Sequence, residues 1–348
     1  MLKPGMIRKY RSFMPKLSEE HIVTLGEGDT PLIRALVLEA VLKSLGAPVK
    51  VYLKFEGANP TGSFKDRGMT VAISEAKSRG IRKVICASTG NTSASAAAYA
   101  ARAGMECEVY LPKGKVAAGK LAQAKIYGAK IVEVDGNFDD ALMEARKKSE
   151  KDPTVELVNS TNPFRLQGQK TAAFEICDDL TQVMDSDLTI TPDYHCIPVG
   201  NGGNITAYWM GYKEYCRHGC IRQLPRMLGF QAARSAPIVR GEVVKKPETV
   251  ATAIRIGNPV HWQNVLKAVR DSQGGIFSVT DDEILYAYAL LASKEQVFCE
   301  PASAASVAGL IQLAATGKVK FHAGEIAVCT LTGHGLKDPA IAAEITNE

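Results

Sequence analysis

Short apolar runs, rich in Val and Ile, alternate along the chain with longer segments whose apolar residues recur at helical spacing. The run 84–87 is followed by an alanine-rich stretch that ends at Gly104, a typical residue at a helix end. This alternation predicts an α/β architecture with mainly parallel sheets. Strands are expected at 51–55, 84–87, 107–111, 130–134, 155–158, 195–199, 227–231 and 326–331, and helices at 93–104, 117–128, 138–151, 167–183, 203–216, 281–293 and 302–316.

The most regular part of this pattern predicts a domain of its own. Residues 59–165 can form a small inserted α/β domain, whereas residues 1–58 and 166–348 are expected to form the larger domain, because the early strand 51–55 fits its sheet. Residues 236–257 lack clear periodicity and are expected to form a long surface excursion.

Composition narrows the functional classes. The formal charge is +5, and Lys and Arg are interleaved with Asp and Glu, so neither nucleic acid nor a membrane surface is an expected partner. We find no apolar run long enough to span a membrane and no hydrophobic core of a secretory signal, so the cytoplasm is the expected location. The eight cysteines lie mostly in apolar surroundings, which fits free thiols in a reducing compartment. Cys216 and Cys220 lack a second ligand cluster, so no metal site is expected.

One lysine occupies an unusual position. A turn rich in Pro and Gly, 59–62, leads into a helix that is expected to begin near Ser63, so that Lys65 lies in the first helical turn. The helix macrodipole disfavours a cation there. Such a lysine makes sense if its amine is used covalently or as a nucleophile. The alternative is a solvated lysine paired with Asp66, but the adjacent Phe64 and the tight turn favour the chemical role.

Two loops between a strand and a helix can bind anions. Residues 87–95 contain more small polar side chains than one helix cap needs, and they precede an alanine-rich helix. Residues 200–204, with the sequence Gly-Asn-Gly-Gly-Asn, follow an apolar strand, and their glycines let the backbone approach an oxyanion closely. The second loop is neither a nucleotide P-loop nor a Gly-x-Gly-x-x-Gly motif.

Two further segments follow strands. Residues 159–165 offer amides, hydroxyls and the guanidinium of Arg165, which suit a second phosphate or a carboxylate, although a turn with a linking arginine is the alternative. Residues 330–335, Thr-Leu-Thr-Gly-His-Gly, contain a hydroxyl that could bond a neutral aromatic nitrogen. His334 is either an acid–base group or a structural residue.

In this order and spacing, the motifs SFKDR, GNTSAS, GNGGN and TGHG resemble those of fold type II pyridoxal-phosphate enzymes. The segments EGDTPL (27–32), NSTNPFR (159–165), ATAIRIGNP (251–259) and EPAS (300–303) make nearly the whole chain similar to the shorter bacterial threonine synthases. The resemblance implies two open, twisted, mainly parallel sheets with flanking helices. It also implies that the larger domain binds pyridoxal 5'-phosphate and that the active site lies between the domains.

The resemblance also implies roles for individual residues. Lys65 carries pyridoxal phosphate as a Schiff base and shuttles protons, and Phe64 lies close to the cofactor. Cofactor contacts are expected from Asn91 to the 3-hydroxyl oxygen, from Gly200, Asn201, Gly202, Gly203 and Asn204 to the phosphate, and from Thr332 to the pyridine nitrogen. Substrate contacts are expected from Ser88, Thr92, Asn159, Ser160, Arg165 and Asn204. Two departures from the family are mild: Gln296 stands where glycine is frequent, and Gly202 where alanine is common.

The implied reaction converts O-phospho-L-homoserine and water to L-threonine and phosphate, by γ-elimination and β-addition of water, the last step of threonine biosynthesis. A homodimer is expected from the resemblance alone. Cysteate synthase, which uses O-phosphoserine and sulfite, would need the same lysine and loops. A threonine or serine dehydratase is disfavoured, because its substrate has no phosphate for residues 159–165 to bind. From another class, a non-catalytic phosphometabolite-binding protein remains an alternative, against which Lys65 argues.

Overall fold

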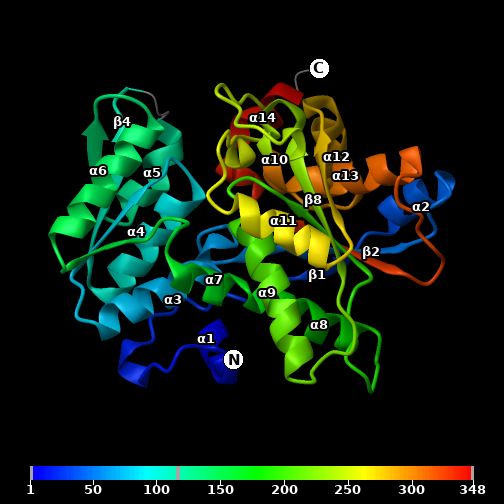
Figure 1. Ribbon diagram of the computed structural model, residues 1–348, viewed down its shortest axis with the longest axis horizontal. Helices are drawn as coiled ribbons and strands as arrows, with labels where there is room; N and C mark the ends of the chain where they lie inside the picture. The colour runs from blue at the N-terminus through cyan, green and yellow to red at the C-terminus, as the bar shows by residue number, and fades with distance from the viewer. Residues whose placement is uncertain (1–2, 115–117, 346–348) are drawn as a thin grey trace. The chain divides into compact units, whose positions relative to one another are not determined.

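The computed structural model describes residues 3–114 and 118–345 of the chain (Figure 1). The chain divides into two compact units. Unit 1 comprises Met1–Asp29 and Asn59–Thr171, and unit 2 comprises Thr30–Ala58 and Ala172–Glu348. The sequence had assigned residues 1–58 to the larger unit, whereas the structure assigns the first 29 of them to the smaller one.

The reason for this assignment is a set of buried hydrogen bonds within unit 1. Thr70 Oγ1 donates to the carbonyl of Val23 at 2.6 Å, and the Val23 amide donates to Ser74 Oγ at 2.9 Å. The Tyr99 hydroxyl donates to Glu27 Oε2 at 2.8 Å. The amino-terminal segment therefore belongs to the same core as the first two helices of the inserted region.

Unit 1 contains a four-stranded parallel sheet in the order β5-β4-β3-β6. Its strands are β3 (Lys83–Ala87), β4 (Glu106–Pro112), β5 (Lys130–Val134) and β6 (Val155–Leu157). Its helices are α1 (Met6–Lys9), α3 (Lys65–Ser78), α4 (Asn91–Ala103), α5 (Ala118–Ile126), α6 (Phe138–Lys151) and α7 (Pro163–Gln169). Parallel strands need crossover connections, and α4 and α6 are two of them, packed on β3 and β4.

Unit 2 contains a six-stranded sheet in the order β1-β2-β10-β7-β8-β9, in which only β1 is antiparallel to its neighbour. Its strands are β1 (Leu32–Arg34), β2 (Lys50–Phe55), β7 (Tyr194–Pro198), β8 (Arg226–Ala232), β9 (Gly275–Val279) and β10 (Ile326–Leu331). Its helices are α2 (Leu36–Ser44), α8 (Thr171–Val183), α9 (Gly203–Arg217), α10 (Pro237–Arg240), α11 (Trp262–Asp271), α12 (Asp281–Lys294), α13 (Pro301–Thr316) and α14 (Pro339–Ile345). The prediction of two mainly parallel sheets with flanking helices is confirmed.

Two details differ from the sequence interpretation. Two helices stand in place of the one expected at 167–183: α7 starts at Pro163 and ends at Gln169, and α8 begins at Thr171. The stretch 236–257 is not wholly a surface excursion, since Ala251 and Ile254 are buried in the core of unit 2. The sequence had also missed β1, β9, α2 and α11.

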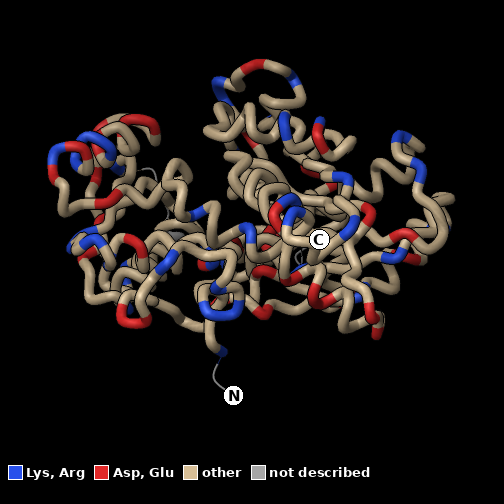
Figure 2. The backbone as a smooth tube through the Cα atoms, turned by 60° about the horizontal axis from the view of Figure 1, so that its bottom comes forward, with Lys and Arg blue, Asp and Glu red and all other residues tan. Residues whose placement is uncertain are grey.

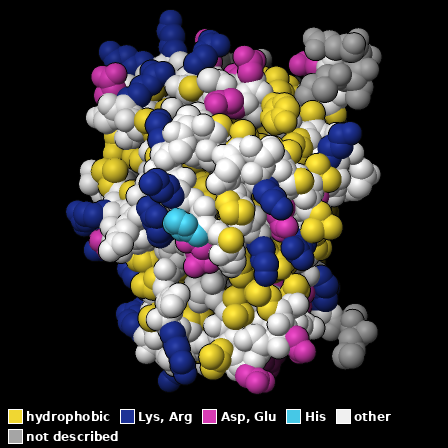
Figure 3. All heavy atoms as spheres, turned by 90° about the vertical axis from the view of Figure 1, so that its right-hand side faces the viewer, with side chains coloured by type: hydrophobic (Ala, Val, Ile, Leu, Met, Phe, Trp, Pro, Cys, Tyr) yellow, Lys and Arg dark blue, Asp and Glu magenta, His cyan; other side chains and the backbone are white. Residues whose placement is uncertain are grey.

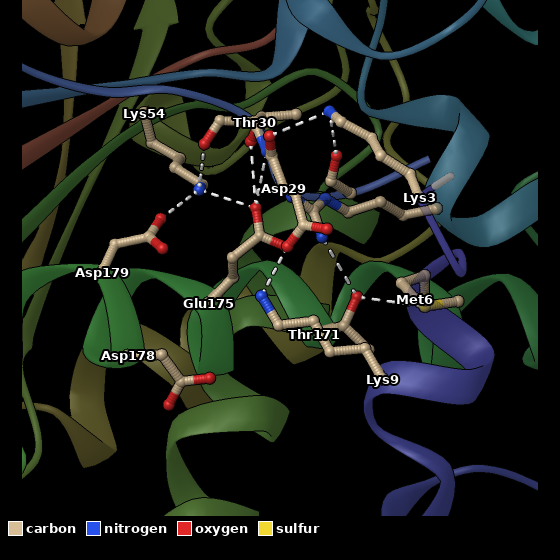
Figure 4. A network of polar contacts seen from close by, with 12 residues as sticks. Lys3, Met6, Lys9, Asp29, Thr30, Lys54, Thr171, Glu175, Asp178 and Asp179 are labelled. Carbon is tan, nitrogen blue, oxygen red and sulfur yellow. Dashed lines mark hydrogen bonds and ion pairs between the residues drawn. The ribbon is translucent and has the colours of Figure 1, made fainter. Parts of the chain in front are cut away.

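A fully buried cation ties two parts of unit 2 together. Lys54 Nζ on β2 donates to the Thr30 carbonyl, to Glu175 Oε1 and to Asp179 Oδ2, each at 2.7 Å (Figure 4). Glu175 and Asp179 lie one turn apart on α8. Burial of an ammonium group is tolerated only where its hydrogen bonds and charge are satisfied, and here all three donors have acceptors. The network therefore fixes the EGDTPL segment to β2 and α8.

Lys and Arg positions are interleaved with Asp and Glu positions along the backbone (Figure 2). None of the helices in the described part of the chain is long and apolar enough to cross a membrane.

Candidate active site

Lys65 is the first residue of α3, as its position in the motif had predicted. It is half-buried, and its Nζ lies 4.2 Å from the centroid of the Phe64 ring. Phe64 caps the helix without a side-chain hydrogen bond and is itself 7% exposed. The amine thus lies over an aromatic ring at a helix amino terminus, a position where the macrodipole disfavours a cation.

The next residue, Asp66, is completely buried and accepts three short hydrogen bonds. The Thr61 amide donates at 2.7 Å and the Thr61 hydroxyl at 2.6 Å, while the Ser95 hydroxyl donates at 2.6 Å from α4. Burial raises the pKa of Asp66 to about 6, and these hydrogen bonds oppose the shift. The carboxyl group therefore connects the Lys65 turn to α4 rather than serving as a surface partner for Lys65.

Three predicted ligands lie at the junction of β3 and α4, and all three are half-buried: Ser88 follows β3, and Asn91 and Thr92 are the first two residues of α4. Gly90 precedes α4 with no side-chain cap on the helix, so backbone amides of its first turn lack intrahelical acceptors. Asn159 donates to the Ala87 carbonyl and accepts from the Ala87 amide, both at 2.9 Å. The Asn159 side chain thereby joins the segment after β6, which also carries Ser160, to the end of β3. These bonds give Asn159 a structural role in addition to the substrate contact that the resemblance implies.

Arg165 lies on α7 and is 1% exposed. Its Nη1 donates to the Val158 carbonyl at 3.2 Å, whereas its Nε has no hydrogen-bond partner among the described residues. No carboxylate in the described ranges forms an ion pair with it, and burial lowers its pKa to about 10. A buried guanidinium without an anion is costly, so this side chain is suited to receive one.

A close contact between two glycines fixes the helix of Lys65 against the helix of Arg165. A Cβ on Gly168 of α7 would lie 1.8 Å from the Arg67 carbonyl oxygen, and a Cβ on Gly68 of α3 would lie 2.8 Å from the Arg165 carbonyl oxygen. Neither neighbour is the end of a flexible side chain, so both positions require glycine. The two predicted catalytic and phosphate-binding segments of unit 1 are therefore held in one rigid pair of helices.

In unit 2, the glycine-rich loop 200–204 joins β7 to α9, as the sequence had predicted. Gly202 has φ +79°, and a Cβ on it would lie 2.4 Å from Val265 Cγ2. Asn204 Nδ2 donates to the Pro198 carbonyl at 2.6 Å, which anchors the loop to the end of the strand. The first-turn amides of α9 have no intrahelical acceptors, and amides in this position suit a phosphate, as the sequence predicts.

Thr332 follows β10, the strand that pairs with β7, so both segments lie at the carboxyl edge of the same parallel sheet. Its hydroxyl is buried and contacts two groups: it donates to Glu300 Oε1 at 3.0 Å and lies 2.9 Å from Ser303 Oγ. In the sequence, Glu300 and Ser303 are recognisable only as members of the EPAS motif, which assigns them no individual role. Their proximity to Thr332 depends on tertiary contacts that no local pattern encodes.

His334 has contacts that support its structural interpretation. Its Nδ1 accepts from the Leu336 amide at 3.2 Å, and its ring centroid lies 6.0 Å from that of Phe55 and 5.8 Å from that of Phe298. Burial, with a smaller contribution from Lys337, lowers its pKa below the usual value. Gln296, which stands where glycine is frequent in the family, has φ +58°, a conformation that glycine adopts without strain.

None of the predicted site residues lines a surface cavity of about 440 Å³ in unit 2. It lies at the amino ends of β7, β8 and β10, with Asp193, Arg226 and Glu325 among its lining residues. Ligands of open α/β sheets bind at the carboxyl ends of the strands, so the chemistry of the loops, and not the size of this cavity, identifies the site.

Comparison with known proteins identifies the family. A family model described as pyridoxal-phosphate dependent enzyme matches residues 23–333. The chain is 57% identical over 340 residues to threonine synthase of Synechocystis sp., a match that covers 98% of this chain and 85% of that protein. It is 52% identical over 348 residues to threonine synthase of Methanocaldococcus jannaschii, with 98% and 82% covered.

The chain belongs to the threonine synthase family of pyridoxal-phosphate-dependent enzymes. The resemblance stated from the sequence is thus confirmed, including the cofactor. Among solved structures, threonine deaminase isoform 2 of Solanum lycopersicum matches with a TM-score of 0.75 at 22% identity, covering 95% of this chain and 90% of that one. Maize serine racemase matches with a TM-score of 0.72 at 19% identity, covering 91% and 92%. These two likenesses support the fold alone.

The threonine synthase family uses pyridoxal phosphate, and the residues of this chain fit that group. The amides at the start of α9 suit its phosphate, Thr332 offers a hydroxyl at the carboxyl edge of the same sheet, and Lys65 offers a primary amine at the start of α3. The individual contacts to cofactor and substrate stay predictions.

Proposed function

We propose that this protein converts O-phospho-L-homoserine and water into L-threonine and phosphate. Membership of the threonine synthase family supports the reaction, and Arg165 is the observation that carries the choice of a phosphorylated substrate. Its guanidinium is buried, has no anionic partner among the described residues and keeps an unpaired Nε. A phosphate dianion would satisfy both deficits. The substrates of dehydratases lack phosphate, so in a dehydratase Arg165 would keep both its missing anion and its unpaired Nε.

Two sets of residues would hold the cofactor. Lys65 is the proposed Schiff-base lysine, with Phe64 beside it and Asn91 as the partner of the 3-hydroxyl oxygen. Unit 2 would contribute the amides of 200–204 to the phosphate and Thr332 to the ring nitrogen. When bound, pyridoxal phosphate supplies an electron sink for charge that develops on the substrate carbon atoms.

The side chains around the substrate have three tasks. The amine of Lys65, once displaced by the substrate amine, accepts the α-proton and later transfers protons at the β- and γ-carbons. Arg165 and nearby helix-terminal amides stabilise the phosphate as negative charge develops on it during departure from the γ-carbon. Ser88, Thr92, Asn159, Ser160 and Asn204 would bind the substrate carboxylate and phosphate and thereby orient the reacting carbons.

The direct test is incubation of the purified holoenzyme with O-phospho-L-homoserine, followed by assays for threonine and for phosphate. Both products should form in equal amounts. Parallel incubations with O-phosphoserine plus sulfite, and with L-threonine or L-serine alone, test the cysteate synthase and dehydratase alternatives. Faster turnover in any of these than with O-phospho-L-homoserine would reject the proposal.

Removal of the proposed Schiff-base lysine separates catalysis from mere binding. Lys65→Ala should abolish threonine formation and the visible absorbance of the bound cofactor, since no other residue of the motif carries a primary amine. Borohydride reduction and peptide mapping of the unaltered protein should label Lys65. Label on another lysine, or full activity of Lys65→Ala, would contradict the assignment, and a non-catalytic phosphometabolite-binding protein would give no product in either form.

We also propose that the protein acts in the cytoplasm as a homodimer, with no nucleic-acid or membrane partner. All eight cysteines are free, which fits a reducing compartment. Helix α2 leaves Leu36 61% and Val37 39% exposed. Hydrophobic side chains lie among Lys and Arg on the face of the molecule that carries this helix (Figures 1 and 3). Sedimentation equilibrium should give twice the chain mass, and a monomer at micromolar concentration would reject the dimer.

A further inference from the structure

Two hydroxyl groups on one face of α4 donate to buried carboxyl groups of unit 1. The Ser95 hydroxyl donates to Asp66 Oδ1 at 2.6 Å, and one turn later the Tyr99 hydroxyl donates to Glu27 Oε2 at 2.8 Å. Each of these four residues is at most 1% exposed. Asn91 precedes Ser95 by four residues, as Ser95 precedes Tyr99, so the three side chains lie on the same face of the helix. The predicted cofactor contact therefore begins the row of side chains that meets these carboxyl groups.

The acceptor of the Ser95 bond is also held by a second segment. Asp66 directly follows Lys65 in the first turn of α3. Its two carboxyl oxygens accept from Thr61, from the hydroxyl at 2.6 Å and from the amide at 2.7 Å. Thr61 belongs to the turn 59–62, which leads into α3. Rotation of the carboxyl group would break at least one of these bonds, so the bond from Ser95 fixes α4 relative to the Lys65 turn.

The bond from Tyr99 provides a second connection, one turn further along α4. Its acceptor, Glu27, is followed by Gly28, whose amide donates to Asn59 Oδ1 at 3.1 Å. Asn59 is the first residue of the turn that leads into α3. Both connections of α4 therefore end at the segment that carries the Schiff-base lysine. Two hydrogen-bonded points on one helix restrict its rotation as well as its movement along the axis.

We infer that Ser95 is a positioning residue that, through Asp66, holds the first turn of α4, and with it Asn91, at a fixed place relative to Lys65. The inference rests on the proposed function, in which Lys65 carries the cofactor and Asn91 donates to its 3-hydroxyl oxygen. Ser95 is the nearer of the two connections, about 6 Å from Asn91 along the helix axis, whereas Tyr99 is about 12 Å away. Because a hydrogen bond depends steeply on distance and angle, a small displacement of Asn91 weakens its bond to that oxygen.

The experiment follows the visible absorption of the cofactor in the holoenzyme during titration with acid and base. A donor to the 3-hydroxyl oxygen withdraws negative charge from it, which lowers the pKa of the neighbouring protonated Schiff-base nitrogen. Asn91→Ala should therefore raise the midpoint of the titration, by about one unit, and this is the reference effect. Ser95→Ala removes one hydroxyl and leaves Asn91 in place, so it should raise the midpoint by about half a unit.

A double variant tests whether Ser95 acts through Asn91. If it does, Asn91→Ala combined with Ser95→Ala should titrate as Asn91→Ala alone, because an effect that one side chain transmits is lost with that side chain. Two independent effects would instead add, and the double variant would then have a higher midpoint than either single variant.

Ser74→Ala is the matched control. Ser74 is completely buried on α3, and its hydroxyl oxygen accepts from the Val23 amide at 2.9 Å, so this variant also loses one buried hydrogen bond of unit 1. Both serine variants should lower the midpoint of denaturant unfolding by similar amounts, but only Ser95→Ala should change the titration. Should Ser95→Ala not fold, Thr61→Val tests the same connection, because it removes a hydroxyl that orients Asp66 Oδ1, and it should raise the titration midpoint as well.

Equal titration midpoints in the unaltered protein, Ser95→Ala and Thr61→Val would overturn the inference. So would additive shifts in the double variant, or a shift in Ser74→Ala as large as that in Ser95→Ala, which would leave Ser95 with a contribution to stability alone. An unchanged midpoint in Asn91→Ala would overturn it too, since Asn91 would then not act on the 3-hydroxyl oxygen. In each case threonine can still form with the cofactor at Lys65, so the proposed function would stand. Failure of the proposed function would appear separately, as a holoenzyme that gives these titrations but forms no threonine.

Discussion

Lys54 of unit 2 and Arg165 of unit 1 are both cations with almost no contact with solvent, but they differ in their partners. Lys54 Nζ satisfies its three donors with Thr30, Glu175 and Asp179, all at 2.7 Å. Among the described residues, the Arg165 side chain has one hydrogen bond, to a carbonyl, and an Nε without a partner. A complete set of hydrogen-bond and ion-pair partners is typical of a structural charge. An incomplete set of partners is typical of a charge that binds a ligand.

The comparison shows how two buried charges can have opposite consequences for stability. Removal of one partner from a satisfied pair leaves the other charge buried and unpaired, which is strongly destabilising. Removal of a charge that has no partner takes away a desolvation cost without creating a new one. Replacement of Lys54 by methionine, which has a similar length, should therefore lower the free energy of unfolding far more than the same replacement of Arg165.

The largest effect on stability is expected from Lys54→Met. Loss of the ammonium removes the buried ion pair of Lys54 with Glu175 and its ion pair with Asp179, so the free energy of unfolding should fall by about 3–5 kcal/mol. Denaturant unfolding of the holoenzyme measures it. Lys267→Met is the matched control, because that lysine is 57% exposed and its ion pair with Asp271 lies at the surface, so its loss should cost less than about 1 kcal/mol. If Lys54→Met lowered the free energy of unfolding by less than about 1 kcal/mol, Lys54 would not be the structural charge that the comparison with Arg165 requires.

Arg165→Met should give the opposite pattern. The free energy of unfolding should change by less than about 1 kcal/mol, because the lost hydrogen bond to Val158 is offset by the removal of a buried charge. Activity should fall much more: kcat/KM for O-phospho-L-homoserine should drop by about a hundredfold, which corresponds to about 2.8 kcal/mol.

Cofactor affinity provides the internal control for Arg165→Met. If Arg165 binds the substrate phosphate and not the cofactor, the apparent dissociation constant of pyridoxal phosphate should stay within about threefold of that of the unaltered protein, less than 1 kcal/mol. Equal losses of cofactor affinity and of kcat/KM would show that Arg165 acts on the cofactor or on folding, and the comparison with Lys54 would then lose its functional meaning.

Asp66 extends the comparison to a buried anion that has donors but no cation. Its pKa is raised by burial to about 6, from 3.8 in the unfolded chain. Below pH 4 both states are protonated, and as the pH rises toward 6 and above the unfolded state loses its proton first. The contribution of Asp66 to stability is therefore lost over this window, by up to about 3 kcal/mol at 1.36 kcal/mol per unit.

Asp66→Asn should remove this pH dependence. The difference in free energy of unfolding between the variant and the unaltered protein should change in favour of Asp66→Asn as the pH rises from 4 to 7, although the variant starts lower because an amide cannot accept all three hydrogen bonds. Asp139→Asn, at an exposed residue of α6, should show no such trend. Parallel curves for all three proteins would mean that the hydrogen bonds hold Asp66 ionised.

Local patterns in the sequence were sufficient to predict much of the fold and where the loops begin. The helix start at Lys65 and the glycine loop after β7 depend on short-range rules about turns, glycine and helix ends. By contrast, β9 and α11 were missed, and the helix 167–183 was divided differently, because packing against distant segments decides them. The close contact of Gly168 with Arg67 is one such distant constraint.

The candidate site shows the same division. The motif identified Lys65, but the partner of Asp66 is Ser95, which is 29 residues away on another helix. Glu300 was visible as part of a motif, and only the pairing of 298–300 with 333–335 brings it to Thr332. The missing partner of Arg165 could not be predicted either, because a sequence contains no information on which polar groups remain unsatisfied after folding.

Inorganic phosphate gives the smallest and most specific test of the comparison. If Arg165 is an anion-binding residue, phosphate should bind the holoenzyme there and raise the free energy of unfolding. The increase should be about 1.4 kcal/mol when the phosphate concentration is ten times the dissociation constant of phosphate. Arg165→Met should lose most of this gain, whereas Lys267→Met should keep it. Sodium chloride at the same ionic strength separates binding of phosphate from general salt effects, because the exposed charges respond to both salts alike. Equal stabilisation of the unaltered protein and Arg165→Met would show that the buried guanidinium is closed to anions, and its missing hydrogen bond would then be a cost of packing rather than a sign of function.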